Sequence, residues 1–347
     1  MKKKMILLLV LCMSMLSGCA GTAVVYYSDC TDPDGAVTGE STSAAAEGAV
    51  KTGLYIGTDL TDSQDGEAKY DVTIVAVTVD DDGVIDSCVI DSIAASVLFD
   101  ENGVITSDLT GEVLSKNELG EDYGMKRYGG AKYEWNEQAA ALAAYASGKT
   151  IAELKNGTID ESGKAADADL ASTATIYLGG YVAGIEQAVN NAQHLGARKG
   201  DDLRLASIST LDGSKGADAE NAGVAQLATD VTALTLDGDT ITSCYIDSIQ
   251  AKVEFDTGGV LTSDLTAEVL TKNQMGEAYG MKQYAGSAYE WNEQAASFAA
   301  YVTGKTAAEV AGIAVDERTA PAEADLASSV TIAIGGFQAL IAKAAQK

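Results

Sequence analysis

Residues 107–150 read SDLTGEVLSKNELGEDYGMKRYGGAKYEWNEQAAALAAYASGKT, and residues 263–306 read SDLTAEVLTKNQMGEAYGMKQYAGSAYEWNEQAASFAAYVTGKT. The two copies align without a gap and are identical at 31 of 44 positions, with a constant offset of 156 residues. This period is too long for a solenoid unit and matches the size of a whole domain. The sequence therefore predicts a duplicated domain, with repeat 1 at residues 51–195 and repeat 2 at residues 196–347, each long enough to bury a core.

The chain begins with the pattern of a lipoprotein signal peptide. Lysines at residues 2–4 precede the apolar run Met5–Met15, which is too short to span a bilayer. Leu16-Ser17-Gly18-Cys19 resembles a lipobox, so we expect cleavage of residues 1–18 and lipidation of Cys19. The lipid would anchor the protein to the extracytoplasmic face of the membrane. The alternative is an ordinary secretory peptide with a chance cysteine.

Residues 19–50 are rich in Gly, Ser, Thr, Ala and Asp and are predicted to form a flexible stalk. The whole chain is acidic, with 51 Asp and Glu against 23 Lys and Arg. Such a surface repels phosphate backbones and argues against a nucleic-acid partner.

Cysteine and histidine are too scarce for most metal sites. Cys88 and Cys244 give one thiol per repeat, inside apolar runs, which favours small buried residues. A bridge between the two repeats stays open as an alternative. Without a CxxC pair, and with His194 as the single histidine, no zinc or haem site is expected.

Each repeat is predicted to begin with antiparallel strands. Residues 72–79 (VTIVAVTV) are apolar and β-branched, the acidic turn at 80–83 follows, and residues 84–93 return the chain. Residues 97–99 and 104–105 suggest another short pair. Residues 231–236 and 241–249 repeat the hairpin.

Helices follow the strands. Residues 109–128 are punctuated by glycine and are interpreted mainly as a loop, with a short helix as an alternative for part of it. Trp135, Ala139, Leu142 and Ala146 recur at helical spacing, and the matching residues of repeat 2 do the same. Thr150 and Thr306 each precede a glutamate by three residues, the pattern of a capping box. The predicted fold class is α+β, with a curved antiparallel sheet packed by helices in each repeat and a linker at residues 193–202.

No arrangement of residues typical of an enzyme is present, so we expect a protein that is not an enzyme. A single histidine excludes a Ser-His-Asp triad in each repeat, and neither a phosphate-binding loop nor a dinucleotide-binding glycine motif occurs. Asp91 and Asp247 are matched carboxylates in predicted strands, where they could equally face solvent.

The last helix of each repeat offers a candidate phosphate site. Hydroxyl residues crowd its expected start, and a helix N-terminus presents free N–H groups and a positive dipole end. The simpler interpretation is that Ser172 and Ser328 are N-caps and that the remaining hydroxyls have no further role. The hydroxyl residues are Ser172, Thr173, Thr175, Ser328, Ser329 and Thr331.

The order of hairpin, loop, helix and an Asp-x-x-Ser-x-x-Thr motif resembles the FMN-binding domain family, which includes flavinylated electron-transfer lipoproteins. The family motif reads Asp-x-x-Ser/Thr-Gly-Ala-Ser/Thr, and a flavin transferase joins FMN phosphate to the last hydroxyl. The resemblance implies that Thr175 and Thr331 accept the flavin. It also implies that the flanking motif is Asp169 with Ser172 in repeat 1, and Asp325 with Ser328 in repeat 2. Thr173 and Ser329 replace the motif glycine, and Val330 replaces the motif alanine in repeat 2.

The repeated stretch supplies candidate walls for a flavin pocket. Tyrosine and tryptophan can stack on a flat ring, lysine can neutralise phosphate, and amides can bind a pyrimidine edge. The candidates are Lys116, Asn117, Tyr123, Lys126, Trp135 and Gln138, matched by Lys272, Asn273, Tyr279, Lys282, Trp291 and Gln294. Trp135 and Met125 could instead belong to the core.

Two functions follow from these patterns. The first is a lipid-anchored FMN-binding electron carrier of the cell envelope, which would need a flavin transferase and a redox partner. The second is a non-redox lipoprotein that binds a small ligand or acts as a scaffold. Replacement of the motif glycine favours the second, and the retained Asp, Ser and Thr favour the first.

Overall fold

The computed structural model describes residues 48–346, which belong to one compact unit. The predicted signal peptide, Cys19 and most of the predicted stalk lie outside the described residues. Within the described part of the chain, no helix is long and apolar enough to cross a membrane.

Each repeat contributes one antiparallel sheet of three strands in sequence order. Sheet 1 consists of β1 (Lys51–Asp59), β2 (Glu67–Val79) and β3 (Ile85–Leu98), and sheet 2 of β4 (Asp202–Thr210), β5 (Gly223–Asp237) and β6 (Thr240–Phe255). The predicted hairpins are confirmed as β2–β3 and β5–β6. The strands β1 and β4 were not predicted, and β4 starts where the predicted linker ends. With the helices described below, the fold class is α+β, as predicted.

The two sheets pack face to face and share one hydrophobic core. Alternate residues of β2, such as Val72 and Ile74, point to one face of sheet 1, as expected for a strand. They join Leu227 and Val231 of β5 in a single buried cluster. Phe99 and Phe255 stack at its edge, with ring centroids 3.8 Å apart. The central core is therefore built by both repeats together.

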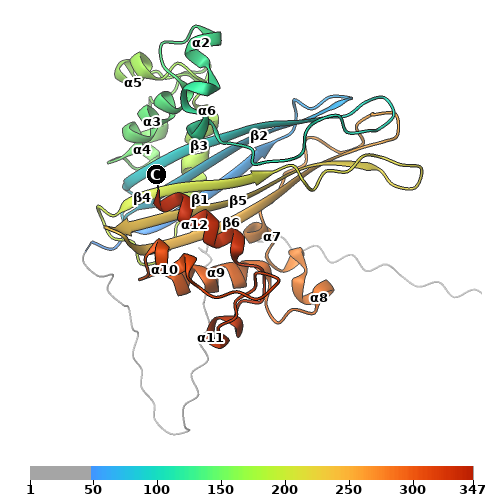
Figure 1. Cartoon of the computed structure of the whole chain (residues 1–347). Coiled ribbons are helices and arrows are strands. Elements are labelled where there is room, and N and C mark those ends of the chain that lie inside the picture. The colour runs from blue at the N-terminus through green and yellow to red at the C-terminus, as the bar shows by residue number, and fades with distance from the viewer. Residues whose placement is uncertain (1–47, 347) are drawn as a thin grey trace, which may run out of the picture. The chain divides into compact units, whose positions relative to one another are not determined.

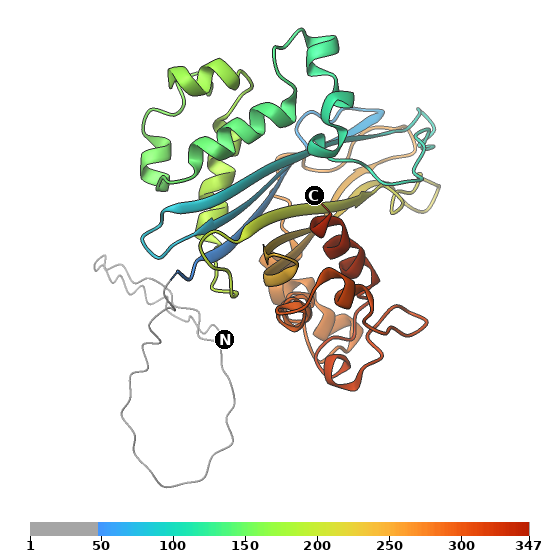
Figure 2. The same cartoon turned by 60° about the vertical axis from the view of Figure 1, so that its left-hand side comes forward.

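Helices cover the outer face of each sheet (Figures 1 and 2). In repeat 1, α3 (Trp135–Ala146) and α6 (Gly179–Asn190) pack on the outward residues of β2 and β3. In repeat 2, α9 (Trp291–Val302) and α12 (Gly335–Ala345) pack on sheet 2 in the same way. The result is four layers, in the order helices, sheet, sheet, helices. Each outer cluster, unlike the central core, belongs to one repeat only.

The segment at residues 109–128, interpreted mainly as a loop with a short helix as an alternative, contains three short helical elements. They are α1 (Lys116–Leu119), η1 (Gly120–Tyr123) and α2 (Met125–Gly129), matched in repeat 2 by α7 (Lys272–Met275), η2 (Gly276–Tyr279) and α8 (Met281–Ala285). The predicted capping boxes are confirmed at α4 (Ile151–Lys155) and α10 (Ala307–Ala311). A last short helix precedes α6 and α12, namely α5 (Ala168–Thr173) and α11 (Ala324–Ala327).

The predicted start of the last helix is wrong in both repeats. Ser172 lies inside α5, whose N-cap is Asp167, and its hydroxyl donates to the carbonyl of Asp169 at 2.7 Å. Ser328 makes the same bond to the carbonyl of Asp325, at the end of α11. The last helices begin only at Gly179 and Gly335.

The physical reason is an extended connection between the two helices. Ala174 has φ −119° and ψ 110°, which ends α5 before Thr175. The N–H of Thr175 then bonds to a side chain 37 residues away in sequence rather than to its own helix. The helix-dipole argument for a phosphate at Thr175 and Thr331 therefore does not apply.

Candidate functional site

Repeat 2 contains a cavity of about 370 Å³ on the outer face of sheet 2. This volume lies at the lower end of the range for small-molecule sites. The lysine, two of the aromatic rings and a methionine come from the repeated stretch 263–306, and the other walls come from β5, from the approach to α12 and from α12 itself. The lining residues are Asp230, Lys272, Tyr279, Met281, Trp291, Ile332, Ala333 and Phe337.

Lys272 gives the cavity a positive charge between aromatic rings. Its ammonium lies 5.3 Å from the ring centroid of Tyr279 and 4.8 Å from that of Trp291, within the range of cation–π attraction. The side chain is partly buried. This lysine and Tyr279 were predicted as pocket residues, and the structure brings them together.

The motif hydroxyl of repeat 2 lies next to this cavity in the chain. Thr331 is exposed, and the residue after it, Ile332, lines the cavity. The side-chain oxygen of Gln294 accepts from the Thr331 N–H at 2.7 Å, from its hydroxyl at 3.1 Å and from the Ile332 N–H at 3.2 Å. Gln294 is fully buried in α9 and thereby fixes the loop that carries the hydroxyl.

The other end of Gln294 holds the loop before α9. Its amide nitrogen donates to the carbonyl of Tyr289 at 3.0 Å and to the hydroxyl of Ser287 at 3.1 Å. Gln294 was predicted as a pocket wall that could bind a ligand edge. Its amide is instead used inside the protein, as a link between the α8–α9 loop and the motif threonine.

Sequence reasoning missed Glu290, which is 3% exposed at the N-terminus of α9. Its carboxylate accepts from the N–H groups of Met281 at 2.8 Å and Lys282 at 3.1 Å, so it fixes the start of α8. Glu134 does the same in repeat 1. The available signal was a glutamate followed three residues later by another glutamate, which is a capping pattern.

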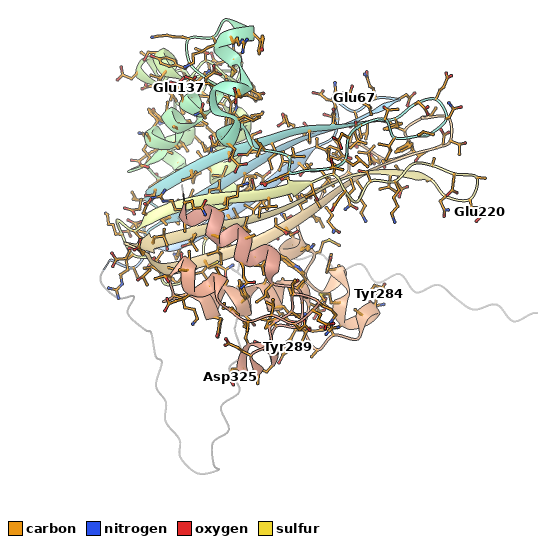
Figure 3. The ribbon with its side chains drawn as sticks, in the orientation of Figure 1. Glu67, Glu137, Glu220, Tyr284, Tyr289 and Asp325 are labelled. Atoms are coloured by element: carbon orange, nitrogen blue, oxygen red, sulfur yellow. The ribbon has the colours of Figure 1, made fainter. Side chains whose placement is uncertain are left out.

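Several predicted site residues do not line this cavity. Lys282 pairs with Glu293 at 2.7 Å. Asn273 joins α7 to β6, since its N–H bonds to Asp247 at 3.1 Å and its side chain donates to the carbonyl of Ile246 at 2.9 Å. Asp325 is exposed on α11, at the bottom of the view in Figure 3. Asn273 therefore shapes the site without reaching into the cavity.

The two matched strand carboxylates are buried rather than solvent-facing. Asp91 is 2% exposed and Asp247 is 8% exposed. Burial raises the pKa of Asp247 to about 6, although hydrogen bonds from Thr271, Asn273 and Ser248 and the charge of Lys272 act in the opposite direction. A solvent-facing position is thus excluded for both.

Repeat 1 reproduces most of these contacts. Thr175 donates to Gln138 through its N–H at 2.7 Å and its hydroxyl at 3.1 Å, and it too is exposed. Lys116 lies 5.4 Å from the ring of Tyr123 and 5.3 Å from that of Trp135. The other predicted residues have structural partners: Asn117 bonds to Asp91 and Ile90, Lys126 pairs with Glu137, and Asp169 lies exposed in the first turn of α5.

Trp135 and Met125 belong to the core of repeat 1, as the alternative interpretation of these two residues predicted. Trp135 is 3% exposed and belongs to the outer hydrophobic cluster of repeat 1, against which Met125 packs. Its indole N–H donates to the hydroxyl of Tyr181 at 3.2 Å. Lys116 therefore lies over rings that also belong to the core of the repeat.

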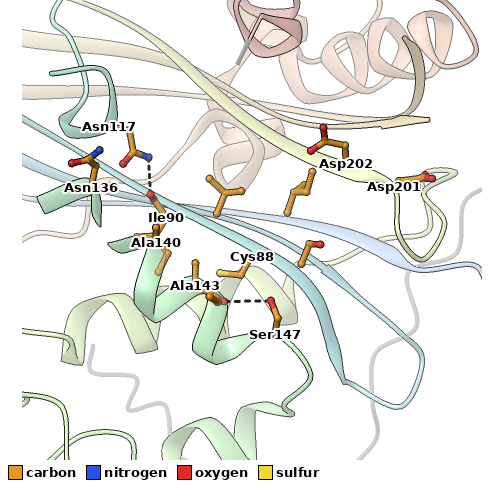
Figure 4. Close-up of a pocket in the computed structure, with 13 residues that line it drawn as sticks. Cys88, Ile90, Asn117, Asn136, Ala140, Ala143, Ser147, Asp201 and Asp202 are labelled. Atoms are coloured by element: carbon orange, nitrogen blue, oxygen red, sulfur yellow. Dashed lines mark hydrogen bonds between the residues drawn. The ribbon is translucent and has the colours of Figure 1, made fainter. Parts of the chain in front are cut away.

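A second cavity of about 380 Å³ lies between α3, β3 and the start of β4 (Figure 4). Cys88, Asn136, Ser147 and Asp202 are among its lining residues. Burial raises the pKa of the Cys88 thiol to about 12, which disfavours the reactive thiolate near neutral pH. Cys88 and Cys244 are both free thiols, so they form no bridge between the repeats.

Comparisons of the chain with family models, with curated proteins and with solved structures gave no match. In residues 48–346, no cluster of three or more His, Cys, Asp or Glu side chains is arranged to hold a metal ion.

Proposed function

We propose that this protein is a lipid-anchored electron carrier of the cell envelope that holds FMN in repeat 2. The observation that carries the proposal is the position of Thr331. Its exposed hydroxyl stands in the family motif and directly precedes a residue of the cavity that Lys272, Tyr279 and Trp291 line. The signal-peptide pattern and Cys19 support the anchored, extracytoplasmic part of the proposal.

The residues around the cavity fit a flavin in their chemistry. Tyr279 is half-buried and offers part of an aromatic ring at the cavity wall, whereas Trp291 is 6% exposed and belongs mainly to the outer core of repeat 2. Lys272 offers a positive charge to an anion, and the carboxylate of Asp230 lines the same cavity. When bound, FMN would supply the electron-transfer chemistry, while the protein would supply its position and electrostatic environment. Gln294 would hold Thr331 in place, since it already binds both the N–H and the hydroxyl of that residue.

The replaced motif glycine does not count against the proposal on conformational grounds. Thr173 lies in the last turn of α5, in a helical conformation that any residue can adopt. Its hydroxyl donates to the carbonyl of Leu170 at 3.0 Å, and Ser329 bonds to Leu326 in the same manner. The backbone at these positions therefore has no need of glycine.

Attachment would join the Thr331 hydroxyl oxygen to the phosphorus of FMN. Because a hydroxyl does not displace water from a phosphate monoester unaided, the donor has to be an activated flavin nucleotide. Its phosphoanhydride bond would break as the new oxygen–phosphorus bond forms, the other half of the donor would leave as a nucleoside monophosphate, and the hydroxyl proton would pass to solvent. A flavin transferase is the partner that would catalyse this step.

The test uses the full-length lipoprotein, extracted with detergent from cells that also express a flavin transferase. We expect a yellow protein whose intact mass includes FMN joined through a phosphoester. Thr331→Val should lose this flavin, and Thr331→Ser should retain it. A colourless, unmodified wild-type protein would contradict the proposal and favour the non-redox ligand-binding alternative.

A further inference from the structure

The two repeats differ at three positions around the buried lysine. The sheet register identifies the matched positions. Asp71 of β2 pairs with Ala94 of β3, and Ala228 of β5 pairs with Gln250 of β6, which lies 156 residues after Ala94. Asp71 therefore corresponds to Ala228. By the same register, Thr73 of β2 corresponds to Asp230 of β5. On the last helix, Tyr181 corresponds to Phe337.

In repeat 1 the residues at two of these positions, Asp71 and Tyr181, supply partners for Lys116 and for Trp135. Lys116 is only 6% exposed, and its ammonium lies 3.7 Å from the carboxylate of Asp71. Asp71 also accepts from the hydroxyl of Ser92 at 3.2 Å. The hydroxyl of Tyr181 accepts from the indole N–H of Trp135, at 3.2 Å. The buried lysine is thus paired without a ligand by a carboxylate at the surface, since the Asp71 side chain is 65% exposed, and the Trp135 N–H has its own acceptor.

In repeat 2 two of these groups are missing. Ala228 replaces the carboxylate that pairs with the lysine, and Phe337 replaces the tyrosine hydroxyl. Within residues 48–346, no carboxylate oxygen lies at salt-bridge distance from the Lys272 ammonium, which keeps its two aromatic neighbours. The new carboxylate, Asp230, lies toward the start of α12, 3.8 Å from where a side chain on Gly336 would begin.

The consequence is an open site in repeat 2. Lys272, the two aromatic rings and the carboxylate of Asp230 line the 370 Å³ cavity, and Phe337 forms an apolar part of its wall. A cation in this setting attracts an anionic ligand that also has an aromatic face.

We infer that the chain binds one flavin, in repeat 2, and that repeat 1 is closed by Asp71 and Tyr181. This inference rests on the proposed function and adds its stoichiometry. A single flavin per chain means that electrons pass between this protein and its partners, and not from one repeat to the other.

The first experiment locates the flavin on the wild-type chain. Full-length protein from cells with a flavin transferase is digested, and the peptides that contain Thr175 and Thr331 are identified by mass spectrometry. We expect a flavin-to-chain ratio of about one from the absorption spectrum, with all flavin on the Thr331 peptide. Flavin on both peptides, or on the Thr175 peptide alone, would overturn this inference and leave a flavin carrier. Flavin on neither peptide would overturn the proposed function as well.

The second experiment exchanges the closing residues between the repeats. Ala228→Asp with Phe337→Tyr should close repeat 2 and remove flavin from the Thr331 peptide. Asp71→Ala with Tyr181→Phe should open repeat 1 and allow flavin on the Thr175 peptide. Urea unfolding of each variant confirms that it is folded. Unchanged loading in a folded Ala228→Asp, Phe337→Tyr variant would refute the role of these residues.

Discussion

Gln294→Met tests whether one buried amide holds the motif threonine in place. Methionine has nearly the same length and volume, so packing is largely kept, while the acceptor and the donor of the amide are removed. Three part-buried backbone groups lose their partner: the N–H groups of Thr331 and Ile332 and the carbonyl of Tyr289.

At about 1 kcal/mol for each of these hydrogen bonds, the free energy of unfolding should fall by about 2–4 kcal/mol. The Thr331 hydroxyl adds little, because it is exposed and water can replace the amide oxygen. Urea denaturation followed by circular dichroism measures the loss. Flavin on the Thr331 peptide should fall as well, since the hydroxyl is no longer held beside the cavity.

Gln138→Met is the matched control in repeat 1, where the same bonds to Thr175 occur. It should cost a similar free energy of unfolding without changing the flavin content. A loss below about 0.5 kcal/mol for Gln294→Met would refute the assignment of these bonds as stabilising. Normal flavin loading in a clearly destabilised Gln294→Met variant would refute the positioning role alone.

Three further predictions concern the fold around the site. Phe255→Ala removes the ring stacked on Phe99 in the core that both repeats share, so it should lower the free energy of unfolding by about 3–5 kcal/mol. Calorimetry should still show one transition, and two separated transitions would contradict a shared core. Because burial raises the pKa of Asp247 to about 6, the stability that it contributes near pH 4 is lost as the pH rises through about 6. Relative to Asp247→Asn, the free energy of unfolding of the wild type should fall by about 1–3 kcal/mol between pH 4 and pH 7 in urea titrations. Parallel pH profiles of the two proteins would exclude this effect. Thr306→Ala removes the N-cap bond to Glu309 and should cost about 1 kcal/mol in the same assay, whereas an unchanged midpoint would show that the cap is dispensable.

The repeat, the hairpins and the main helices could be predicted from the sequence because each depends on neighbours in the chain. The β-branched run at residues 72–79 and the apolar spacing from Trp135 to Ala146 are local patterns, and both elements form as predicted. The capping boxes at Thr150 and Thr306 join residues only three positions apart. Such signals need no knowledge of the fold.

Errors arose where the partner of a group lies far away in sequence. The start of α6 was misplaced because the N–H of Thr175 bonds to Gln138, 37 residues earlier. Asp91 and Asp247 could not be recognised as buried from local patterns. Each accepts a hydrogen bond from a backbone N–H that lies 26 residues further along the chain, in Asn117 and Asn273 respectively. No local pattern contains these contacts.

The sequence by itself determined the duplication, the hairpin strands, the main helices and the hydroxyl motif of each repeat. A continuous apolar run such as residues 72–79 also indicates that both faces of a strand are covered. Only the tertiary structure decided what covers them: the other repeat's sheet on the inner face and the repeat's own helices on the outer face. It also decided that Lys272 lines a cavity while Lys116 is matched by Asp71, because that difference depends on residues from separate strands and helices that meet only after folding.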